Sequence, residues 1–388
     1  MTPRDVSGHG AGQARSKNEW LQLARQAVLD LVDDQLAVAH AELEARLCEH
    51  GVVYDGQKDR LHSHIITEAV QGLRNLHALD EVTHTTRGSR AVKLLVPADR
   101  RLRRTEINKA ISRKGMLYAR FFNLSTTTGE AGERVLRHSL SIAGPHVIPM
   151  EKGFGEVRTT MGVKLYGALD SGAWLHSIDD EGLPRRPFAL PIEMKNRRQW
   201  FYPIHKEVYQ LLGKAAVLQM KHPTQPMVPI FVCRTAHPWL AWMAKDLGFL
   251  VTTNRRQFAT LPHKMTPKLF EELRTELALS DLTLVTEESL PSIQKFFQET
   301  IIKQAARAAP RWAAAAATVE PFATRLRTEN IPPADRLNLV RELRQELEFV
   351  MPKAGFKEPL LGWSLPDQEE WQDELDDEGW SQDDIDSL

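Results

Sequence analysis

The sequence predicts an α/β protein with three parts: a small helical domain that ends in two strands, a central block built on a mixed sheet, and a helical C-terminal region. Its 388 residues suffice for two or three domains. The spacing of apolar residues is helical at first and changes to period two near residue 82. Between residues 125 and 262, helical and strand-like segments alternate, an order typical of a mixed sheet with helices on both faces.

The composition excludes several classes of protein. The chain is 42% hydrophobic but has no apolar run of about 18 residues, so we expect no membrane span. Residues 1–17 lack the apolar core of a secretion signal and are expected to be a flexible leader of a cytoplasmic protein. Cys48 and Cys233 lie far apart and outside any C-x-x-C, which excludes a disulfide framework and a zinc ribbon.

Charge is unevenly distributed along the chain. Residues 367–388 hold eleven acidic side chains and no Lys or Arg, and the rest of the chain has 50 basic and 40 acidic residues. We expect residues 353–388 to be an acidic, disordered tail that binds a protein partner, occupies a basic groove or only aids solubility. Eleven basic residues lie between Arg87 and Arg120, a concentration typical of a nucleic-acid contact or of a solvated face.

Residues 18–99 carry a pattern of three amphipathic helices followed by two short strands with a basic turn between them. Gly51 is expected to close the second helix. The two strands alternate in polarity and read as a hairpin. These helices and strands are expected at residues 18–31, 36–47, 62–79, 82–86 and 91–96.

This order of elements resembles the winged-helix family. The resemblance implies that the third helix is presented to the major groove of DNA and that the hairpin contacts the phosphate backbone. On this sequence those roles fall to Arg74 in the helix and to Arg87 and Arg90 in the hairpin. Winged helices also serve as protein-protein modules, and that alternative stays open. Residues 100–124 then form a basic linker.

The central block, residues 125–262, is expected to hold helices and strands in alternation. Residues 263–352 are expected to be mainly helical and to carry no chemistry. The helices of the central block are expected at residues 129–140, 205–221 and 239–247, and its strands at residues 163–174, 188–194, 227–233 and 249–253.

One strand of the block ends on a Glu-x-Lys triplet. Period two places Glu193 and Lys195 side by side on one face of this strand. Upstream, Asp170 ends the strand 163–170, which is expected to pair antiparallel with the strand of Glu193. Two carboxylates then converge, and such a hard, oxygen-rich site is typical of Mg²⁺.

These residues resemble the PD-(D/E)XK phosphodiesterase superfamily, in its Mrr-like restriction endonuclease and Holliday-junction-resolvase branch. The likeness covers residues 129–253 and includes the superfamily's first helix, whose glutamate matches Glu133 better than Glu130. The fold implied is a mixed-sheet PD-(D/E)XK nuclease core with an N-terminal winged-helix domain and a helical C-terminal region. The catalytic set implied by the resemblance is Glu133, Asp170, Glu193, Lys195 and Gln210.

The resemblance also implies a cofactor, which is Mg²⁺ with Mn²⁺ as an alternative. Its ligands would be Asp170, Glu193, the Met194 carbonyl and Glu133, the last directly or through water. Lys195 would position or deprotonate the attacking water and neutralise phosphate charge.

Two basic residues directly follow the signature. Arg197 and Arg198 could contact phosphates beyond the scissile bond, although a solvent-facing loop is an equal alternative.

The resulting hypothesis is a magnesium-dependent endonuclease that hydrolyses phosphodiester bonds of double-stranded DNA. Restriction-like, antiviral defence against foreign DNA is the setting that the family suggests, with repair or recombination next. Cutting both strands needs two centres, so a homodimer is expected. The alternatives are a DNA-binding or adaptor protein with an inert nuclease fold, and an RNA-directed nuclease. The motifs of P-loop NTPases, α/β-hydrolases and classical dinucleotide-binding proteins are absent from the sequence.

Overall fold

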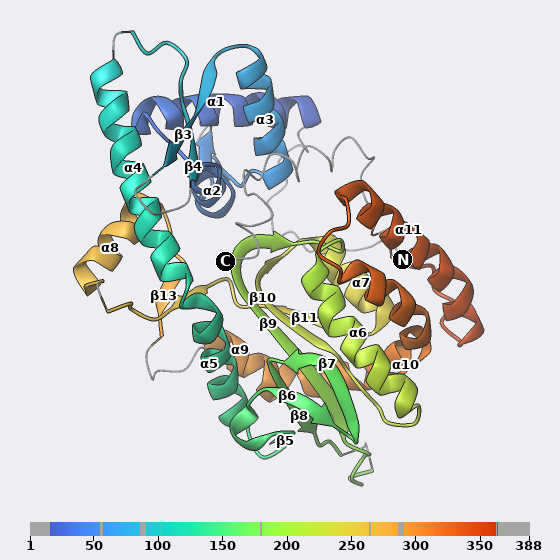
Figure 1. Cartoon of the computed structure of the whole chain (residues 1–388). Helices are drawn as coiled ribbons and strands as arrows, with labels where there is room; N and C mark the ends of the chain where they lie inside the picture. The colour runs from blue at the N-terminus through green and yellow to red at the C-terminus, as the bar shows by residue number, and fades with distance from the viewer. Residues whose placement is uncertain are drawn as a thin grey trace. The chain divides into compact units, whose positions relative to one another are not determined.

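The chain divides into two compact units, which are described separately. The computed structural model describes residues 16–54, 57–85, 91–101, 103–178, 181–263, 265–285, 291–361 and 363. Among the described residues, unit 1 holds those up to Arg120 together with Thr275–Leu279, and unit 2 holds Phe121–Arg274 and those from Ser280 onward (Figure 1). Among the helices in these ranges, none is both long and apolar enough to cross a membrane.

Unit 1 contains the three helices and the strand pair that the apolar spacing predicts. Side chains of the first and third helices form its buried core with the paired strands. A short strand pair between the second and third helices was not expected. The elements are α1 (Lys17–Gln35), α2 (His40–Leu43), the π-helical turn η1 (Glu44–His50), β1 (Val52–Tyr54), β2 (Gln57–Asp59), α3 (Ser63–Asn75), β3 (Leu79–Thr85) and β4 (Ala91–Pro97).

Helix α1 begins inside the segment expected to be a leader. The Ser16 hydroxyl accepts a hydrogen bond from the Glu19 amide at 3.4 Å, and the Glu19 carboxylate accepts one from the Ser16 amide at 2.6 Å. This capping box satisfies backbone donors that the first turn leaves free. The expectation of a flexible leader over residues 1–17 is therefore wrong for Ser16 and Lys17, and residues 1–15 lie outside the described residues.

The stretch expected to be a basic linker is largely helical. Helix α4 (Arg104–Ser125) covers most of residues 100–124, and Ile107 and Ile111 are among its buried side chains. Apolar residues at helical spacing thus convert a basic segment into an amphipathic helix.

Unit 2 is built on a mixed, five-stranded sheet, as expected. The strand order is β11-β10-β9-β8-β5, with β9, β10 and β11 parallel to one another and with β8 antiparallel to β9 and to β5 (Figure 1). The strands are β5 (Val147–Pro149), β8 (Ser171–Leu175), β9 (Phe188–Phe201), β10 (Ile230–Ala236) and β11 (Leu250–Thr253).

Pro191 lies in β9, which is a central strand. Proline cannot donate a backbone hydrogen bond, so it normally occurs at an edge or an interruption. On the β8 side it lies opposite Gly172. On the other side it falls between an isolated bridge at Ala189 and the start of the β10 ladder at Ile192. The parallel ladder is therefore interrupted where the proline occurs.

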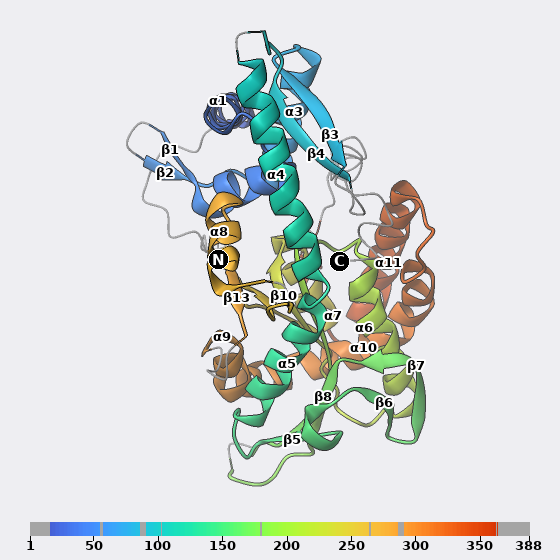
Figure 2. The same ribbon diagram turned by 60° about the vertical axis from the view of Figure 1, so that its left-hand side comes forward.

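Helices cover both faces of the sheet. Helix α5 (Thr128–Ser141) packs on β9 from one side, where apolar residues of both elements share a buried core. Helix α6 (Lys206–Lys221) joins β9 to β10 and packs on the opposite face (Figures 1 and 2). Helix α7 (Pro238–Leu247) joins β10 to β11. The helices expected at residues 129–140, 205–221 and 239–247 are confirmed.

The rest of unit 2 is mainly helical, as expected for residues 263–352, but it also contributes β13, which pairs with β12. Helix α10 packs along α6 and then turns into α11. These remaining elements are η2 (Lys152–Phe154), β6 (Val157–Thr160), β7 (Val163–Leu169), β12 (Gln257–Ala259), α8 (Pro267–Glu276), β13 (Leu282–Leu284), α9 (Pro291–Lys295), η3 (Phe296–Thr300), α10 (Ile301–Leu326) and α11 (Pro333–Lys353).

The segment after α11 packs on unit 2 before the acidic residues begin. Trp363 is 1% exposed, and its indole Nε1 donates a hydrogen bond to Asp246 Oδ2 at 2.9 Å. Burial raises the pKa of Asp246 to about 6, against the lowering effect of this hydrogen bond. The expectation of disorder over residues 353–388 is thus wrong for 353–361 and for Trp363, while residues 364–388 lie outside the described residues.

Replacing Trp363 by phenylalanine should lower the free energy of unfolding by about 1–3 kcal/mol, because the buried Asp246 carboxyl loses its indole donor. Urea unfolding measures the change. Trp242→Phe is the matched control, since Trp242 is 40% exposed. Equal urea midpoints for the two variants would contradict a contribution from the Trp363 hydrogen bond.

Candidate active site

Strand β9 carries two charged side chains on the face that α6 covers. Glu193 is 1% exposed and Lys195 is partly buried, whereas Ile192 and Met194 point into the core beneath α5. The expected alternation of this strand is confirmed. A carboxylate and an ammonium are therefore placed side by side within a packed sheet.

Asp170 reaches the same point from the neighbouring strand, but not through the pairing that the sequence predicts. The strand before it, β7, pairs with β6, and the strand after it, β8, pairs with β9. Ser171 lies opposite Ile192, so Asp170 comes level with Glu193. The Met194 amide donates a hydrogen bond to Asp170 Oδ2 at 2.7 Å, which holds the carboxyl at this edge of β9.

The two carboxyls meet two lysines. Lys195 Nζ lies 2.9 Å from Glu193 Oε2 and 3.6 Å from Asp170 Oδ2. Lys214 comes from α6, and its Nζ donates to the other oxygen of Glu193 and to the Ala168 carbonyl. Both oxygens of the buried Glu193 are therefore bound to ammonium groups.

This cluster lines a cavity of about 520 Å³ in unit 2. Gln210 lines it from α6, one helical turn before Lys214, as the resemblance implies. The connection from α10 to α11 supplies the remaining wall. The lining residues are Tyr166, Gly167, Ala168, Asp170, Glu193, Lys195, Gln210, Lys214, Arg327, Thr328 and Glu329.

Tyr166 and Arg327 lie together in the wall of this cavity. The Arg327 guanidinium stacks 3.5 Å from the centroid of the Tyr166 ring, and the Tyr166 hydroxyl donates to the Gln210 carbonyl at 3.2 Å. Gly213 permits this approach, because a Cβ at that position would lie 2.5 Å from the hydroxyl oxygen. Arg327, which lies outside the expected nuclease core, thus places a cation in the cavity wall, where Tyr166 holds it.

The electrostatics of the cluster shift the pKa values of the two carboxyls in opposite directions. Burial and the negative charge of Glu193 raise the pKa of Asp170 to about 7, although Lys195 lowers it. Burial also acts to raise the pKa of Glu193, but Lys195 and Lys214 outweigh it and hold that pKa below its ordinary value. Burial acts to lower the pKa of Lys195, but Glu193 and Asp170 raise it overall. In the absence of metal, Lys195 is thus held in its protonated form.

The pKa of Asp170 predicts how stability depends on pH in the absence of divalent metal. Its value of about 7 exceeds the ordinary 3.8, so the folded chain binds this proton more tightly than the unfolded chain. The resulting stabilisation is complete below about pH 4 and is lost as the pH rises through 7. Between pH 5 and pH 8 we expect a loss on the order of 2 kcal/mol.

Asp170→Asn is the reference for this measurement, because the amide mimics the protonated carboxyl and does not titrate. Urea unfolding in EDTA at several pH values should show the wild type losing stability relative to Asp170→Asn between pH 5 and pH 8. Parallel pH profiles of the two proteins would show that Asp170 does not titrate as expected.

Glu133 lies on α5 and does not line the cavity. Its carboxylate is paired with Arg137 at 2.8 Å. Burial raises its pKa against the effect of Arg137, and Lys195 and Glu193 also act on it. The structure therefore places Glu133 within the electrostatic range of the cluster without direct contact with it.

The backbone of Met194 lies beside Asp170. Its amide points at Asp170, and the amide and carbonyl of one strand residue point to the same side of the strand. The Met194 carbonyl therefore faces the edge of β9 that Asp170 occupies.

Three of the arginines expected to contact nucleic acid are held in ion pairs. Arg74 lies 3.5 Å from Glu81, Arg197 lies 2.9 Å from Glu207, and Arg198 lies 2.7 Å from Asp281. Arg197 and Arg198 are partly buried, so the solvent-facing loop that was their alternative is wrong. The other two residues of this set, Arg87 and Arg90, lie outside the described residues.

The basic stretch between Arg87 and Arg120 is partly neutralised within unit 1. Lys114 is buried, and its Nζ lies 2.6 Å from Glu42. Four further members of the stretch form ion pairs, so its net positive field is weaker than the sequence indicates. These pairs are Lys93 with Glu81, Arg100 with Asp80, Arg103 with Asp33 and Arg113 with Glu276.

Two carboxyls of this cluster supply hard oxygen donors of the kind that divalent cations prefer. Asp170 and Glu193 lie so close that they share a hydrogen bond, and the first is half protonated near pH 7. A bound cation would replace that proton between two hard oxygen donors. Within the described ranges, however, no group of three His, Cys, Asp or Glu side chains is close enough to hold a metal ion.

Sequence reasoning missed Lys214, Tyr166 and Arg327. Lys214 had a signal, since it follows Gln210 by four residues and therefore lies on the same helix face. Tyr166 and Arg327 had none, because their meeting depends on how α10 packs against α6.

Comparison of the chain with protein-family models, with curated proteins and with solved structures finds no match.

Proposed function

We propose that the protein is a divalent-metal-dependent endonuclease that hydrolyses phosphodiester bonds of double-stranded DNA. In this proposal unit 2 contains a PD-(D/E)XK nuclease core, and unit 1 is a winged-helix domain. One observation carries the proposal: Asp170, Glu193 and Lys195 come from adjacent strands and meet in one cavity. Their order along the chain is the order that the resemblance implies.

The chemistry follows from the charges of the cluster. Asp170, Glu193 and the Met194 carbonyl would hold Mg²⁺, or Mn²⁺ in its place. When bound, such an ion supplies positive charge to the phosphorane and lowers the pKa of a water molecule. Lys195 stays protonated and offsets negative charge on the scissile phosphate. Gln210 has a side-chain amide that can orient the attacking water.

The order of elements in unit 1 supports a DNA-binding role for that unit. Three helices precede the strand pair β3 and β4, as in winged-helix domains. Cleavage of both strands by one centre per chain makes a homodimer the expected active species. Restriction-like defence against foreign DNA is the proposed setting, and the resemblance supplies its support.

The direct experiment is cleavage of supercoiled plasmid by the full chain. Nicked or linear products should form with Mg²⁺ or Mn²⁺ and should be absent with EDTA. An excess of double-stranded RNA should leave the rate unchanged, because the proposed substrate is DNA. Preferential cleavage of RNA would reverse the assignment of the substrate.

An inert nuclease fold that only binds nucleic acid is the second candidate. Two observations favour it: Lys195 and Lys214 occupy both oxygens of Glu193, and Glu133 does not line the cavity. Titration calorimetry separates the candidates, since an active centre should bind Mn²⁺ and an inert one should not. DNA binding without cleavage and without Mn²⁺ binding would establish the second candidate.

A further inference from the structure

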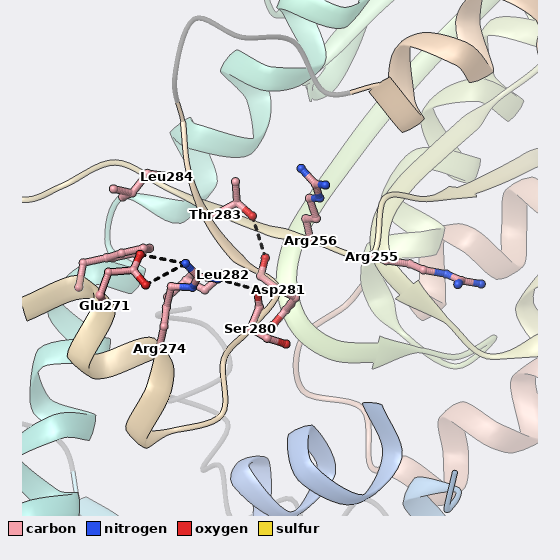
Figure 3. Close-up of a pocket in the computed structure, with 10 residues that line it drawn as sticks. Arg255, Arg256, Glu271, Arg274, Ser280, Asp281, Leu282, Thr283 and Leu284 are labelled. Carbon is pink, nitrogen blue, oxygen red and sulfur yellow. Dashed lines mark hydrogen bonds and ion pairs between the residues drawn. The ribbon is translucent and has the colours of Figure 1, made fainter. Parts of the chain in front are cut away.

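Unit 2 contains a second cavity of about 500 Å³, distinct from the candidate active site. It lies between the loop that follows β11, helix α8 and the residues around β13 (Figure 3). Three arginines are among its lining residues. The complete lining is Arg255, Arg256, Phe270, Glu271, Arg274, Ser280, Asp281, Leu282, Thr283 and Leu284.

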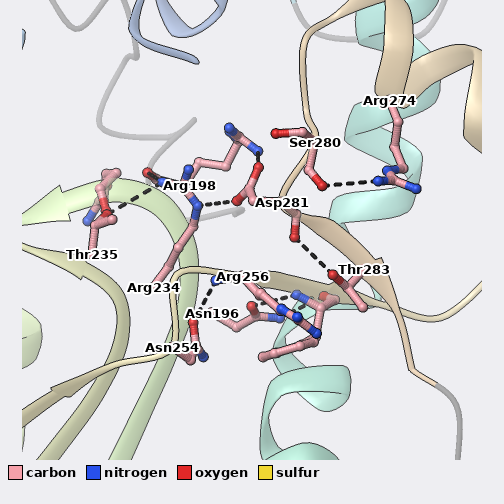
Figure 4. A network of polar contacts seen from close by, with 12 residues as sticks. Asn196, Arg198, Arg234, Thr235, Asn254, Arg256, Arg274, Ser280, Asp281 and Thr283 are labelled. Carbon is pink, nitrogen blue, oxygen red and sulfur yellow. Dashed lines mark hydrogen bonds and ion pairs between the residues drawn. The ribbon is translucent and has the colours of Figure 1, made fainter. Parts of the chain in front are cut away.

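Asp281, which lines this cavity, belongs to a buried ion triad. Asp281 accepts hydrogen bonds from Arg198 Nη1 at 2.7 Å and from Arg234 Nε (Figure 4). Arg234 is 2% exposed and also donates to the Arg198 carbonyl at 2.8 Å. Burial acts to raise the pKa of Asp281, but the two arginines lower it overall, so Asp281 is ionised. Among the described residues, the triad therefore sets two guanidiniums against one carboxylate.

Further arginines add to this charge. Arg274 is paired with Glu271 at 2.9 Å. Arg255 and Arg256 are exposed, and no described residue pairs with either guanidinium; their side chains leave the loop in different directions (Figure 3). Among the described residues, the lining of the cavity thus includes two guanidiniums, those of Arg255 and Arg256, with which no carboxylate is paired.

The loop that carries Arg255 and Arg256 is held in place by its backbone. Arg255 has a φ of 53°, in the left-handed region that is costly for residues other than glycine. Its amide donates to the Arg234 carbonyl at 3.0 Å, and the Arg256 amide donates to Asn254 Oδ1 at 3.0 Å. The two guanidiniums are therefore presented by a defined turn, which lowers the ordering cost of binding.

The position of the cavity in the sheet also favours a ligand. Arg198 and Arg234 lie at the irregularity near the carboxyl end of the β9–β10 ladder, and Arg255 follows β11. Ligands of α/β sheets commonly bind at this end of the strands. Lys195 contacts the groups on the α6 face, whereas Asn196 and Arg198 contact Phe258 and Asp281 at β12 and β13. The two cavities are thus separated by the sheet, although β9 contributes to both sites.

We propose that this arginine cavity binds the backbone phosphates of a nucleic-acid strand away from the bond that is cut. Its unpaired guanidiniums point in different directions, which suits consecutive phosphates along a strand better than one small anion. The inference rests on the proposed function in that both need a nucleic-acid ligand, but it concerns binding alone.

The test measures binding of a fluorescent duplex DNA by the full chain in EDTA, so that cleavage plays no part. In Arg255→Gln/Arg256→Gln the Kd should rise about tenfold, and the slope of log Kd against log salt should fall by about two. The control is Arg185→Gln/Arg186→Gln, an exposed adjacent pair before the opposite end of β9. Equal thermal melting of the variants checks that they fold.

The outcomes separate the inference from the proposed function. A loss of affinity confined to the Arg255/Arg256 variant supports the inference, even if the wild type cleaves nothing. Equal effects of the two double variants, or an unchanged salt slope, overturn it. ATP is the second probe, and binding of ATP at this cavity without binding of duplex DNA would also overturn it, because the site would then take a free nucleotide.

Discussion

Asp170→Asn should lower the initial rate of plasmid cleavage in Mg²⁺ on the order of 10³-fold. The amide keeps an acceptor for the Met194 N–H, so the local backbone geometry is retained. It removes the anionic oxygen that, beside Glu193, would hold the metal ion. The measurement is the initial rate of nicking of supercoiled plasmid at pH 8, where the wild-type Asp170 is ionised.

Two controls make this result specific. Asp335→Asn removes an exposed carboxylate in the first turn of α11 and should leave the cleavage rate unchanged. Affinity of Asp170→Asn for duplex DNA in EDTA should equal that of the wild type, because the variant changes the reaction and not the binding surface. Full cleavage activity of Asp170→Asn would refute the catalytic role of the cluster.

Asp281→Ala should cause the largest loss of stability, about 3–5 kcal/mol. Asp281 is the carboxylate between Arg198 and Arg234, and its removal takes away the anion that pairs with both of these partly or fully buried cations. The two guanidiniums then lose the carboxylate that offsets their mutual repulsion and their desolvation. The measurement is the urea midpoint of the full chain, followed by tryptophan fluorescence.

Glu271→Ala is the matched control for the same cavity. Glu271 also pairs with an arginine, Arg274, but its side chain is 61% exposed, and such a surface pair contributes less than about 1 kcal/mol. If the urea midpoint of Asp281→Ala falls no further than that of Glu271→Ala, solvent offsets the charge of Arg198 and Arg234 when the carboxylate is removed. Asp281 would then not be the residue that holds the arginines together.

The elements of this protein were largely predictable from local pattern. Apolar spacing correctly predicted α1, α3, α5, α6 and α7, and period two correctly predicted β9 and the common face of Glu193 and Lys195. Helix and strand periodicity depend on residues only a few positions apart, which the sequence displays directly. Local pattern failed in residues 100–124, where abundant basic side chains concealed an amphipathic helix.

The pairing of elements needed the tertiary structure. Asp170 and Glu193 do meet, but through β8 and not through the strand that precedes Asp170, since strand pairing is decided by packing over the whole sheet. Packing also brought Lys214 onto Glu193 and left Glu133 off the cavity wall. The sequence was sufficient to identify Asp170, Glu193 and Lys195, but it did not reveal the strand pairing that joins them or the contact of Lys214 with Glu193.

The arginines illustrate the same division. Composition shows where basic residues are abundant, yet Lys114, Arg197 and Arg198 are neutralised by carboxylates that lie 10 to 83 residues away in the chain. Arg255 and Arg256 were not singled out in the sequence, and their side chains have no partner among the described residues. Periodicity and residue chemistry are local and could be read from the chain alone. Burial, ion pairing and the charge of a cavity depend on contacts between distant segments, so only the folded structure decided them.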